Sequence, residues 1–156
     1  MELELVYQHN DFYLVNKPPG VGFHDERQAD NQRVTGFFNL CCEQLGETLY
    51  PVHRLDKLTS GLLILARNKN TANWFQQAFE QKQIEKLYLA LSVNKPKKKQ
   101  GSIIGDMEKA RSSQWKLVKT KKQPAVSRFF SWGLESPLSS LRLFLIKPET
   151  GKTHQI

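Results

Sequence analysis

The stretch PVHRLDKLTSGLLILA, residues 51–66, places a short polar segment between two apolar ones. Its last part, LLILA at residues 62–66, is a continuous apolar run with the length and composition of a buried strand. The polar residues before it are therefore expected to form a loop at a strand end, where a rigid scaffold commonly holds catalytic groups. Asp56 is the carboxylate in this loop and the first candidate for chemistry.

The segments before this loop predict two strands and a helix. Residues 5–7 and 12–15 are short apolar runs joined by polar residues, a pattern typical of a β-hairpin. The sequence KPPG, residues 17–20, ends the second strand, because its prolines remove backbone donors and its glycine permits a sharp reversal. Apolar residues at helical spacing then predict an amphipathic helix over residues 34–45, with Gly46 at its C-terminus.

The segments after the loop predict a second helix and then consecutive strands. Residues 72–79 repeat apolar side chains at helical spacing, and Asn68 or Asn70 is expected to cap this helix. Residues 87–93 alternate with period two, so Tyr88 is expected to point away from the neighbouring leucines. The fold class is therefore predicted to be α+β, with a mixed, mostly antiparallel sheet and flanking helices. The remaining strands are expected over residues 102–104, 114–118, 125–132 and 141–146.

Length and composition indicate one globular domain. The 156 residues match the usual domain size of about 100 to 150 residues. The longest purely apolar run, residues 62–66, is too short to cross a bilayer. The N-terminal sequence MELEL is acidic and lacks the basic-then-apolar order of a secretory signal, so we expect a cytoplasmic protein with no membrane partner.

The cysteines and histidines show no spacing typical of metal ligands. Cys41 and Cys42 are adjacent and lie inside the predicted helix, which favours packing over a disulfide or a four-ligand zinc site. The four histidines, at positions 9, 24, 53 and 154, are scattered along the chain. We therefore expect neither a metal nor a cofactor.

The net charge of +8 is distributed unevenly along the chain. Residues 1–50 hold three basic and eight acidic side chains, whereas residues 95–128 hold eleven basic and two acidic ones. This basic segment either binds a polyanion, with an affinity that falls as salt rises, or is a solvated loop that aids solubility. The candidate phosphate contacts are Lys97, Lys98, Lys99, Lys109, Arg111, Lys116, Lys119, Lys121 and Lys122.

Four motifs, in order along the chain, resemble those of the RluA-type RNA pseudouridine synthases. The central motif is HRLD at residues 53–56, followed by TSG at residues 59–61. The other three are VNKPPG at residues 15–20, KLYLAL at residues 86–91 and TGKTHQI at residues 150–156. The resemblance implies a single pseudouridine synthase-like catalytic domain over residues 1–156. It also implies that the C-terminal part is missing, because in the family the last motif continues through another Arg into further sheet and helix.

The resemblance also implies an activity: isomerisation of specific uridines in ribosomal or transfer RNA. Asp56 would be the catalytic nucleophile, attacking either the ribose or the uracil ring. Tyr88 would stack on the target uracil, and Lys152, where the family usually has Arg, would keep the carboxylate ionised. Arg54 would fill the gap left when the uridine is flipped out of its stack. The other residues expected to bind substrate or to hold the loops are His53, Thr59, Lys17, His154 and Gln155. Lys17 either contacts phosphate or simply finishes its strand.

Two other functions fit the same residues. The first is an RNA-binding module of the same ancestry with weak or no catalysis, which Lys152 and the incomplete last motif favour. The second is a base-releasing glycosidase built on a single nucleophilic carboxylate, which would produce free uracil. The sequence leaves open which RNA and which uridine are recognised, and in which oligomeric state the protein acts.

Overall fold

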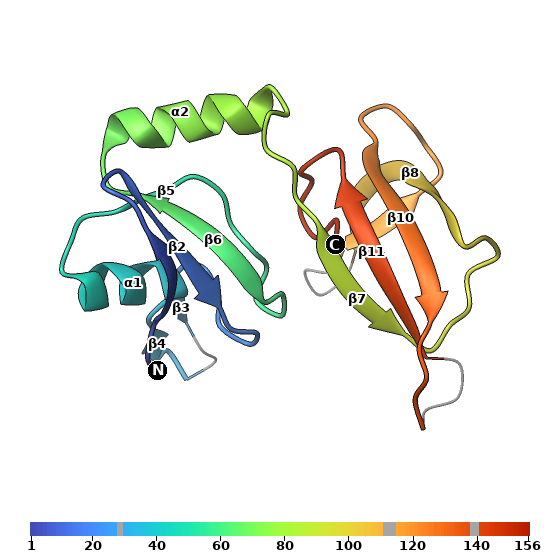
Figure 1. Ribbon diagram of the computed structural model, residues 1–156, viewed down its shortest axis with the longest axis horizontal. Helices are drawn as coiled ribbons and strands as arrows, with labels where there is room; N and C mark the ends of the chain where they lie inside the picture. Colours follow the sequence, from blue (N-terminus) through green and yellow to red (C-terminus); the bar gives the residue numbers. More distant parts are fainter. Residues whose placement is uncertain (28–29, 111–114, 138–140) are drawn as a thin grey trace. The chain divides into compact units, whose positions relative to one another are not determined.

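The computed structural model describes residues 1–27, 30–110, 115–137 and 141–156. These residues form two compact units, Met1–Gln83 (unit 1) and Ile84–Ile156 (unit 2), each built on its own main sheet (Figure 1). Every strand pairing among the described residues is antiparallel, and two helices accompany the strands, so the predicted α+β class is confirmed. The expectation of a single catalytic domain over residues 1–156 stays a prediction.

Unit 1 contains a four-stranded sheet in the order β1-β2-β6-β5 and a small two-stranded sheet. In the larger sheet the strands are β1 (Glu4–Gln8), β2 (Phe12–Lys17), β5 (Tyr50–Pro51) and β6 (Gly61–Ala66). The small sheet pairs β3 (Glu26–Arg27) with β4 (Arg33–Val34). The helices are α1 (Phe37–Leu45) and α2 (Lys69–Glu80). The predicted hairpin of β1 and β2 is confirmed.

One face of the larger sheet forms the core of unit 1. Val15 of β2 is paired with Leu63 of β6, and Tyr13 with Leu65, and all four side chains are buried. Residues on either side of them point to the other face, because side chains alternate along a strand. Helix α1 adds its buried Phe37 and Cys41 to the interior.

The beginning of α1 differs from the sequence prediction. Val34, expected in the helix, belongs to β4, and the helix begins at Phe37 after Gly36. The carboxylate of Asp25 accepts a hydrogen bond from the Gly36 amide (2.7 Å), and a side chain at Gly36 would collide with the backbone of His24. The first two helical amides, of Phe37 and Phe38, donate to the carbonyls of Gly22 and Phe23, so contacts with residues distant in the sequence accompany the start at Phe37. The predicted end is confirmed, since Gly46 adopts φ +65° as a left-handed C-cap.

The cap of α2 follows from local sequence. The side chain of Asn68 accepts a hydrogen bond from the Thr71 amide at 2.8 Å, so the first of the two predicted cap residues is confirmed.

Unit 2 is a five-stranded sheet in the order β7-β11-β10-β8-β9. Its strands are β7 (Tyr88–Ser92), β8 (Gln100–Lys109), β9 (Trp115–Val118), β10 (Ala125–Gly133) and β11 (Arg142–Pro148). Strand β8 is longer than predicted. Its first half pairs with β10, and its second half pairs with β9 to form a hairpin.

The two faces of this sheet differ. Tyr88 of β7 lies opposite Ile146 of β11, which in turn lies opposite Phe129 of β10, so these three share one face. Leu89 and Leu91 point to the other face, as the alternation predicts, and they are 69% and 62% exposed. The described part of unit 2 thus leaves an apolar sheet face open to solvent.

Candidate active site

The loop that carries Asp56 connects β5 to β6 in unit 1. Leu55 anchors it from inside, since its side chain is only 6% exposed, while the Asp56 side chain beside it is half-buried. The Thr59 amide donates to the Asp56 carbonyl at 3.0 Å and closes a turn. Gly61 then starts β6 with φ +129°, a conformation that side-chain-bearing residues rarely adopt. The HRLD and TSG motifs are therefore the two halves of one tight connection.

The buried side chain of Lys17 supports this loop through hydrogen bonds to backbone carbonyls. Its side chain is fully buried, and its ammonium donates to the carbonyls of Pro18 (2.9 Å), Lys57 (3.2 Å) and Thr59 (2.9 Å). Burial lowers the pKa of Lys17, while the nearby negative charge of Asp56 acts in the opposite direction. All three hydrogen bonds of this ammonium therefore go to backbone carbonyls, and the two roles expected for Lys17, phosphate contact and strand ending, stay predictions.

The KPPG turn contacts the same loop. The Gly20 amide donates to the Lys57 carbonyl at 2.8 Å, and Gly20 itself adopts φ +84°. The Lys57 ammonium also forms an ion pair with Glu26. Two motifs that are about forty residues apart in the sequence thus form one structural assembly around Asp56.

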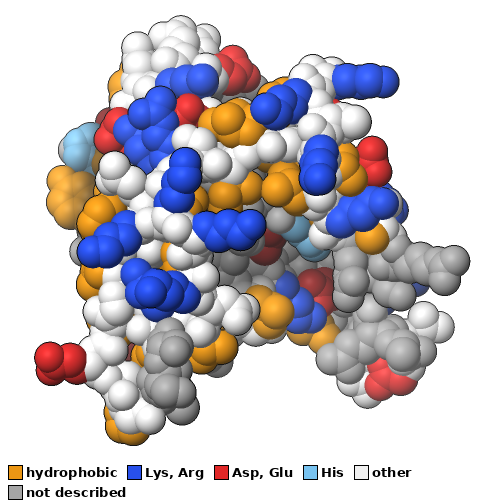
Figure 2. Space-filling view, turned by 90° about the vertical axis from the view of Figure 1, so that its right-hand side faces the viewer, with side chains coloured by type: hydrophobic (Ala, Val, Ile, Leu, Met, Phe, Trp, Pro, Cys, Tyr) orange, Lys and Arg blue, Asp and Glu red, His pale blue; other side chains and the backbone are white. Residues whose placement is uncertain are grey.

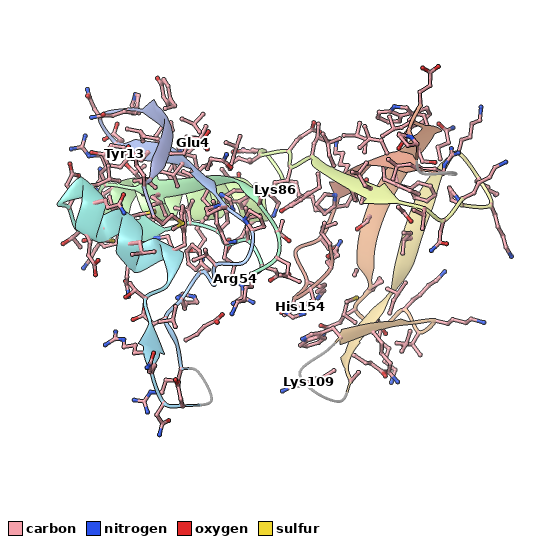
Figure 3. All side chains as sticks on the ribbon, turned by 90° about the horizontal axis from the view of Figure 1, so that it is seen from below. Glu4, Tyr13, Arg54, Lys86, Lys109 and His154 are labelled. Carbon is pink, nitrogen blue, oxygen red and sulfur yellow. The ribbon has the colours of Figure 1, made fainter. Side chains whose placement is uncertain are left out.

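The side chains of Arg54 and Asp56 make few contacts within the described residues of unit 1. Arg54 is exposed and extends from the loop (Figure 3). The carboxylate of Asp56 accepts no hydrogen bond from the described residues of unit 1, and its nearby cation there is Lys17. Both side chains are therefore available for contacts outside this unit's own packing.

His53 precedes them and is half-buried. Its Nε2 accepts a hydrogen bond from the Ile64 amide at 3.1 Å, and its ring lies against Phe79 of α2, with 5.1 Å between the ring centroids.

In unit 2 the end of the chain is fastened to β10 by Gln155. Its amide nitrogen donates to the carbonyl of Val126 (3.0 Å) and to the hydroxyl of Ser127 (2.9 Å). Its amide oxygen accepts from the Thr150 hydroxyl (2.8 Å) and from the Lys152 backbone amide (2.9 Å). Gln155 therefore links the TGKTHQ loop to β10, and its expected role toward the substrate stays a prediction.

Tyr88 and this loop lie toward the same face of the unit 2 sheet. Ser127, which Gln155 contacts, is two residues from Phe129 along β10 and so shares the face of Tyr88. Tyr88 is half-buried, and Lys152 and His154 are exposed. His154 has φ +53°, and its ring lies 6.5 Å from that of Trp115 on the β8–β9 hairpin. Of the expected residues, Tyr88, Lys152, His154 and Gln155 belong to unit 2, and the others belong to unit 1.

Many cations of the basic segment lie on the surface. Lysine and arginine side chains are spread over the face seen in Figure 2, with apolar side chains between them. Lys116 forms an ion pair with Glu108 at 3.7 Å. Arg111 lies outside the described residues. The other candidate phosphate contacts are all exposed: Lys97, Lys98, Lys99, Lys109, Lys116, Lys119, Lys121 and Lys122.

One carboxylate in this basic region has a structural task that the sequence did not suggest. Asp106 accepts hydrogen bonds from the backbone amides of Lys122 and Gln123, both at 2.9 Å, and these bonds lower its pKa. It therefore holds the chain between β9 and β10 against β8. A lone aspartate among lysines carries no sequence signal for this role.

No group of three or more His, Cys, Asp or Glu side chains among the described residues is placed to hold a metal ion. No helix in the same residues is long and apolar enough to cross a membrane.

Solved structures of pseudouridylate synthase domain proteins share this antiparallel α+β fold. The structure is similar to human RNA Pseudouridylate Synthase Domain Containing 1, with a TM-score of 0.77 at 23% identity, over 99% of this chain and 62% of that one. It is also similar to human RNA Pseudouridylate Synthase Domain Containing 4, with a TM-score of 0.68 at 25% identity, over 97% and 61% of the two chains.

The chain belongs to the RNA pseudouridylate synthase family, whose sequence profile matches residues 11–156. An uncharacterized RNA pseudouridine synthase of Haemophilus influenzae is 51% identical over 157 residues, which cover 100% of this chain and 66% of that protein. The tRNA pseudouridine synthase C of Yersinia pestis is 34% identical over 99% of this chain and 63% of its own length. The ribosomal large subunit pseudouridine synthase C of Rickettsia bellii is 32% identical over 97% and 50%.

These relatives confirm the resemblance to the RluA-type enzymes. The chain spans between half and two thirds of the length of the relatives named here.

Proposed function

We propose that this protein is an RNA pseudouridine synthase that isomerises specific uridines in ribosomal or transfer RNA, with Asp56 as its catalytic residue. Family membership and the names of the tRNA and ribosomal relatives support the substrate class. The observation that carries the proposal is the loop around Asp56, whose backbone carbonyls at Lys57 and Thr59 are held by a buried ammonium. A loop fixed in this way presents its carboxylate in a defined position, as nucleophilic catalysis requires.

The reaction is an isomerisation in which atoms balance without a cofactor. The bond from ribose C1′ to uracil N1 breaks, the base turns, and a bond from C1′ to C5 forms. The proton on C5 is lost to solvent, and N1 gains one. In the proposal Asp56 forms a transient covalent bond with either the ribose or the ring, which divides the step into two easier ones.

The other residues have proposed roles around this carboxylate. Tyr88 would stack on the flipped uracil, an interaction worth about 1 to 3 kcal/mol per base. Arg54, exposed on the same loop, would occupy the space the base has left. Lys152 would place a positive charge at the carboxylate. The exposed lysines of the basic segment would contact the phosphates of the RNA.

The test is pseudouridine formation in RNA from cells that lack the gene. The chain is incubated with total RNA, and new pseudouridines are mapped by carbodiimide labelling and primer extension. We expect new sites with the wild type and none with Asp56→Asn, which keeps the shape but loses the charge. Asp30→Asn changes an exposed turn carboxylate that binds the Gln32 amide, and it should keep the activity. Absence of product with the wild type would contradict the proposal.

A second candidate function is RNA binding without catalysis, and a separate observation favours it. Lys152 keeps the charge of the family's arginine but not its planar fork. This candidate predicts RNA binding that weakens with salt, is unchanged by Asp56→Asn, and yields no pseudouridine. A base-releasing activity is separated from both by free uracil in the reaction mixture.

A further inference from the structure

His53 stands where the chain leaves the sheet of unit 1. Strand β5 ends with Pro51 opposite Leu65 of β6, so continued pairing would bring the next residue, Val52, opposite Ile64. The chain departs instead, and the Ile64 amide finds its acceptor in the imidazole of His53 at 3.1 Å. The side chain thus takes the place that a backbone carbonyl of a longer β5 would occupy.

The hydrogen bond engages one nitrogen of the ring. His53 Nε2 is the acceptor for the Ile64 amide, a role that an imidazole nitrogen can take. The same ring lies against Phe79 of α2, with centroids 5.1 Å apart. One side chain is therefore held by a strand and by a helix at once.

This contact lies immediately before the proposed catalytic residues. Arg54 follows directly, Leu55 is buried, and Asp56 comes next. Lys17 holds the part of the loop after Asp56 through the carbonyls of Lys57 and Thr59, and none of its hydrogen-bond partners lies between β5 and Asp56. In that first part of the loop Leu55 is buried, and the hydrogen bond between His53 and Ile64 adds a polar anchor.

We propose that His53 is a positioning residue for the proposed reaction: by replacing the end of the β5 ladder it sets the direction in which Arg54 and Asp56 leave the sheet. It acts through these two neighbours and does not itself bind the substrate. The inference rests on the proposed function, because it assigns His53 a part in presenting Asp56. Its structural half, the bond to the Ile64 amide, can be measured without any activity.

The test compares two substitutions at one position. In His53→Gln the amide oxygen can still accept from Ile64, whereas His53→Leu fills the space without an acceptor. Amide hydrogen exchange of Ile64, followed by NMR, should be slow in the wild type and in His53→Gln, and about tenfold or more faster in His53→Leu. Equal exchange in all three proteins would overturn the proposal.

Steady-state kinetics of the His53 variants distinguish a positioning role of this residue from direct contact with the RNA substrate. His53→Leu should lower kcat about tenfold or more, with KM for RNA changed by less than about twofold, because a small misplacement of a reacting group is costly. His53→Gln should recover most of this loss. If His53→Gln keeps the Ile64 amide protected and is nevertheless as slow as His53→Leu, the imidazole contacts the substrate and the proposal fails.

Two further outcomes of these experiments also test the proposal: a folding failure of His53→Leu, and a lack of activity in the wild type. If His53→Leu fails to fold, NMR on the wild type provides the test, through the scalar coupling across the hydrogen bond between Ile64 N and His53 Nε2. A detectable coupling supports the role of His53 as an anchor for the Ile64 amide. Absence of the coupling overturns it. Should the wild type make no pseudouridine while the exchange results hold, the proposed function fails and the anchor at the end of β5 stands.

Discussion

Replacement of the buried Lys17 by methionine tests the physical account of the Asp56 loop most directly. Methionine has nearly the same length and volume but no ammonium, so the carbonyls of Pro18 and Thr59 would lose this donor, while the Lys57 carbonyl would keep the Gly20 amide. A buried carbonyl left without a partner costs about 1 to 3 kcal/mol. Relief from burying a charge acts in the opposite direction, and water can reach part of a loop. We therefore expect Lys17→Met to lower the free energy of unfolding by about 2 kcal/mol.

Urea unfolding followed by circular dichroism measures this change. The matched control is Lys69→Met, the same substitution at an exposed lysine of unit 1, which should stay within about 0.5 kcal/mol of the wild type. In Lys17→Met the amides of Gly20 and Thr59, both bonded to the loop backbone, should also exchange faster. If Lys17→Met unfolds like Lys69→Met and both amides keep their protection, the loop does not depend on this ammonium.

The same residue gives a dependence on pH with a definite sign. Because burial lowers the pKa of Lys17 in the folded protein, the unfolded chain binds this proton more tightly. Between the lowered pKa and the ordinary value of 10.5, unfolding takes up protons, so the stability contributed by this group rises as pH rises. Lys17→Met should lose this rise, whereas Lys69→Met should keep it.

Three further predictions concern other parts of the chain. Hydrogen bonds from the Gly36 amide and from Arg33 lower the pKa of Asp25 from 3.8 to about 2, so its contribution to stability is lost only as pH falls toward that value. Asp25→Asn should therefore lower the thermal midpoint at neutral pH, and the difference from the wild type should vanish near pH 2, as a melting series will show. Leu89→Thr should leave the free energy of unfolding within about 0.5 kcal/mol and reduce dye binding to apolar surface, whereas Leu65→Ala in the core should cost about 2 to 5 kcal/mol. A strong loss of stability in the Leu89 variant would contradict an open sheet face. If the basic segment binds RNA, alanine in place of the exposed lysines Lys119, Lys121 and Lys122 should weaken the salt dependence of binding. In a plot of log affinity against log salt concentration, the slope should become less steep by about 0.7 for each lost phosphate contact. The control is Lys69→Ala, which should leave the slope unchanged.

Features set by neighbouring residues could be predicted from the sequence. The cap of α2 depends on Asn68 and the amide three residues later, and the end of α1 depends on the freedom of Gly46. The orientation of Tyr88 follows from strand alternation alone. Each of these needs only the chain within one turn or one strand, so local pattern is sufficient.

Features set by distant residues could not be predicted in the same way. The late start of α1 depends on the segment before it: the Gly36 amide donates to Asp25, eleven positions earlier, and the first helical amides donate to the carbonyls of Gly22 and Phe23. The position of Lys17 under the loop depends on Thr59, forty-two positions later. The sequence offered phosphate contact and strand ending as equal roles for this lysine, because its partners are backbone carbonyls, which carry no residue-specific signal.

The contacts in unit 1 also explain how a loop can be rigid and still leave its carboxylate available. Had the carboxylate of Asp56 itself fastened the loop, as that of Asp25 fastens the start of α1, those hydrogen bonds would occupy its oxygens. Instead the fastening falls on backbone carbonyls, through Lys17, and on a backbone amide, through His53. Side chains that act on the backbone fix the position of Asp56 without consuming its oxygens. The nucleophilic role proposed for Asp56 needs this arrangement, because position and an unoccupied lone pair must be supplied at the same atom.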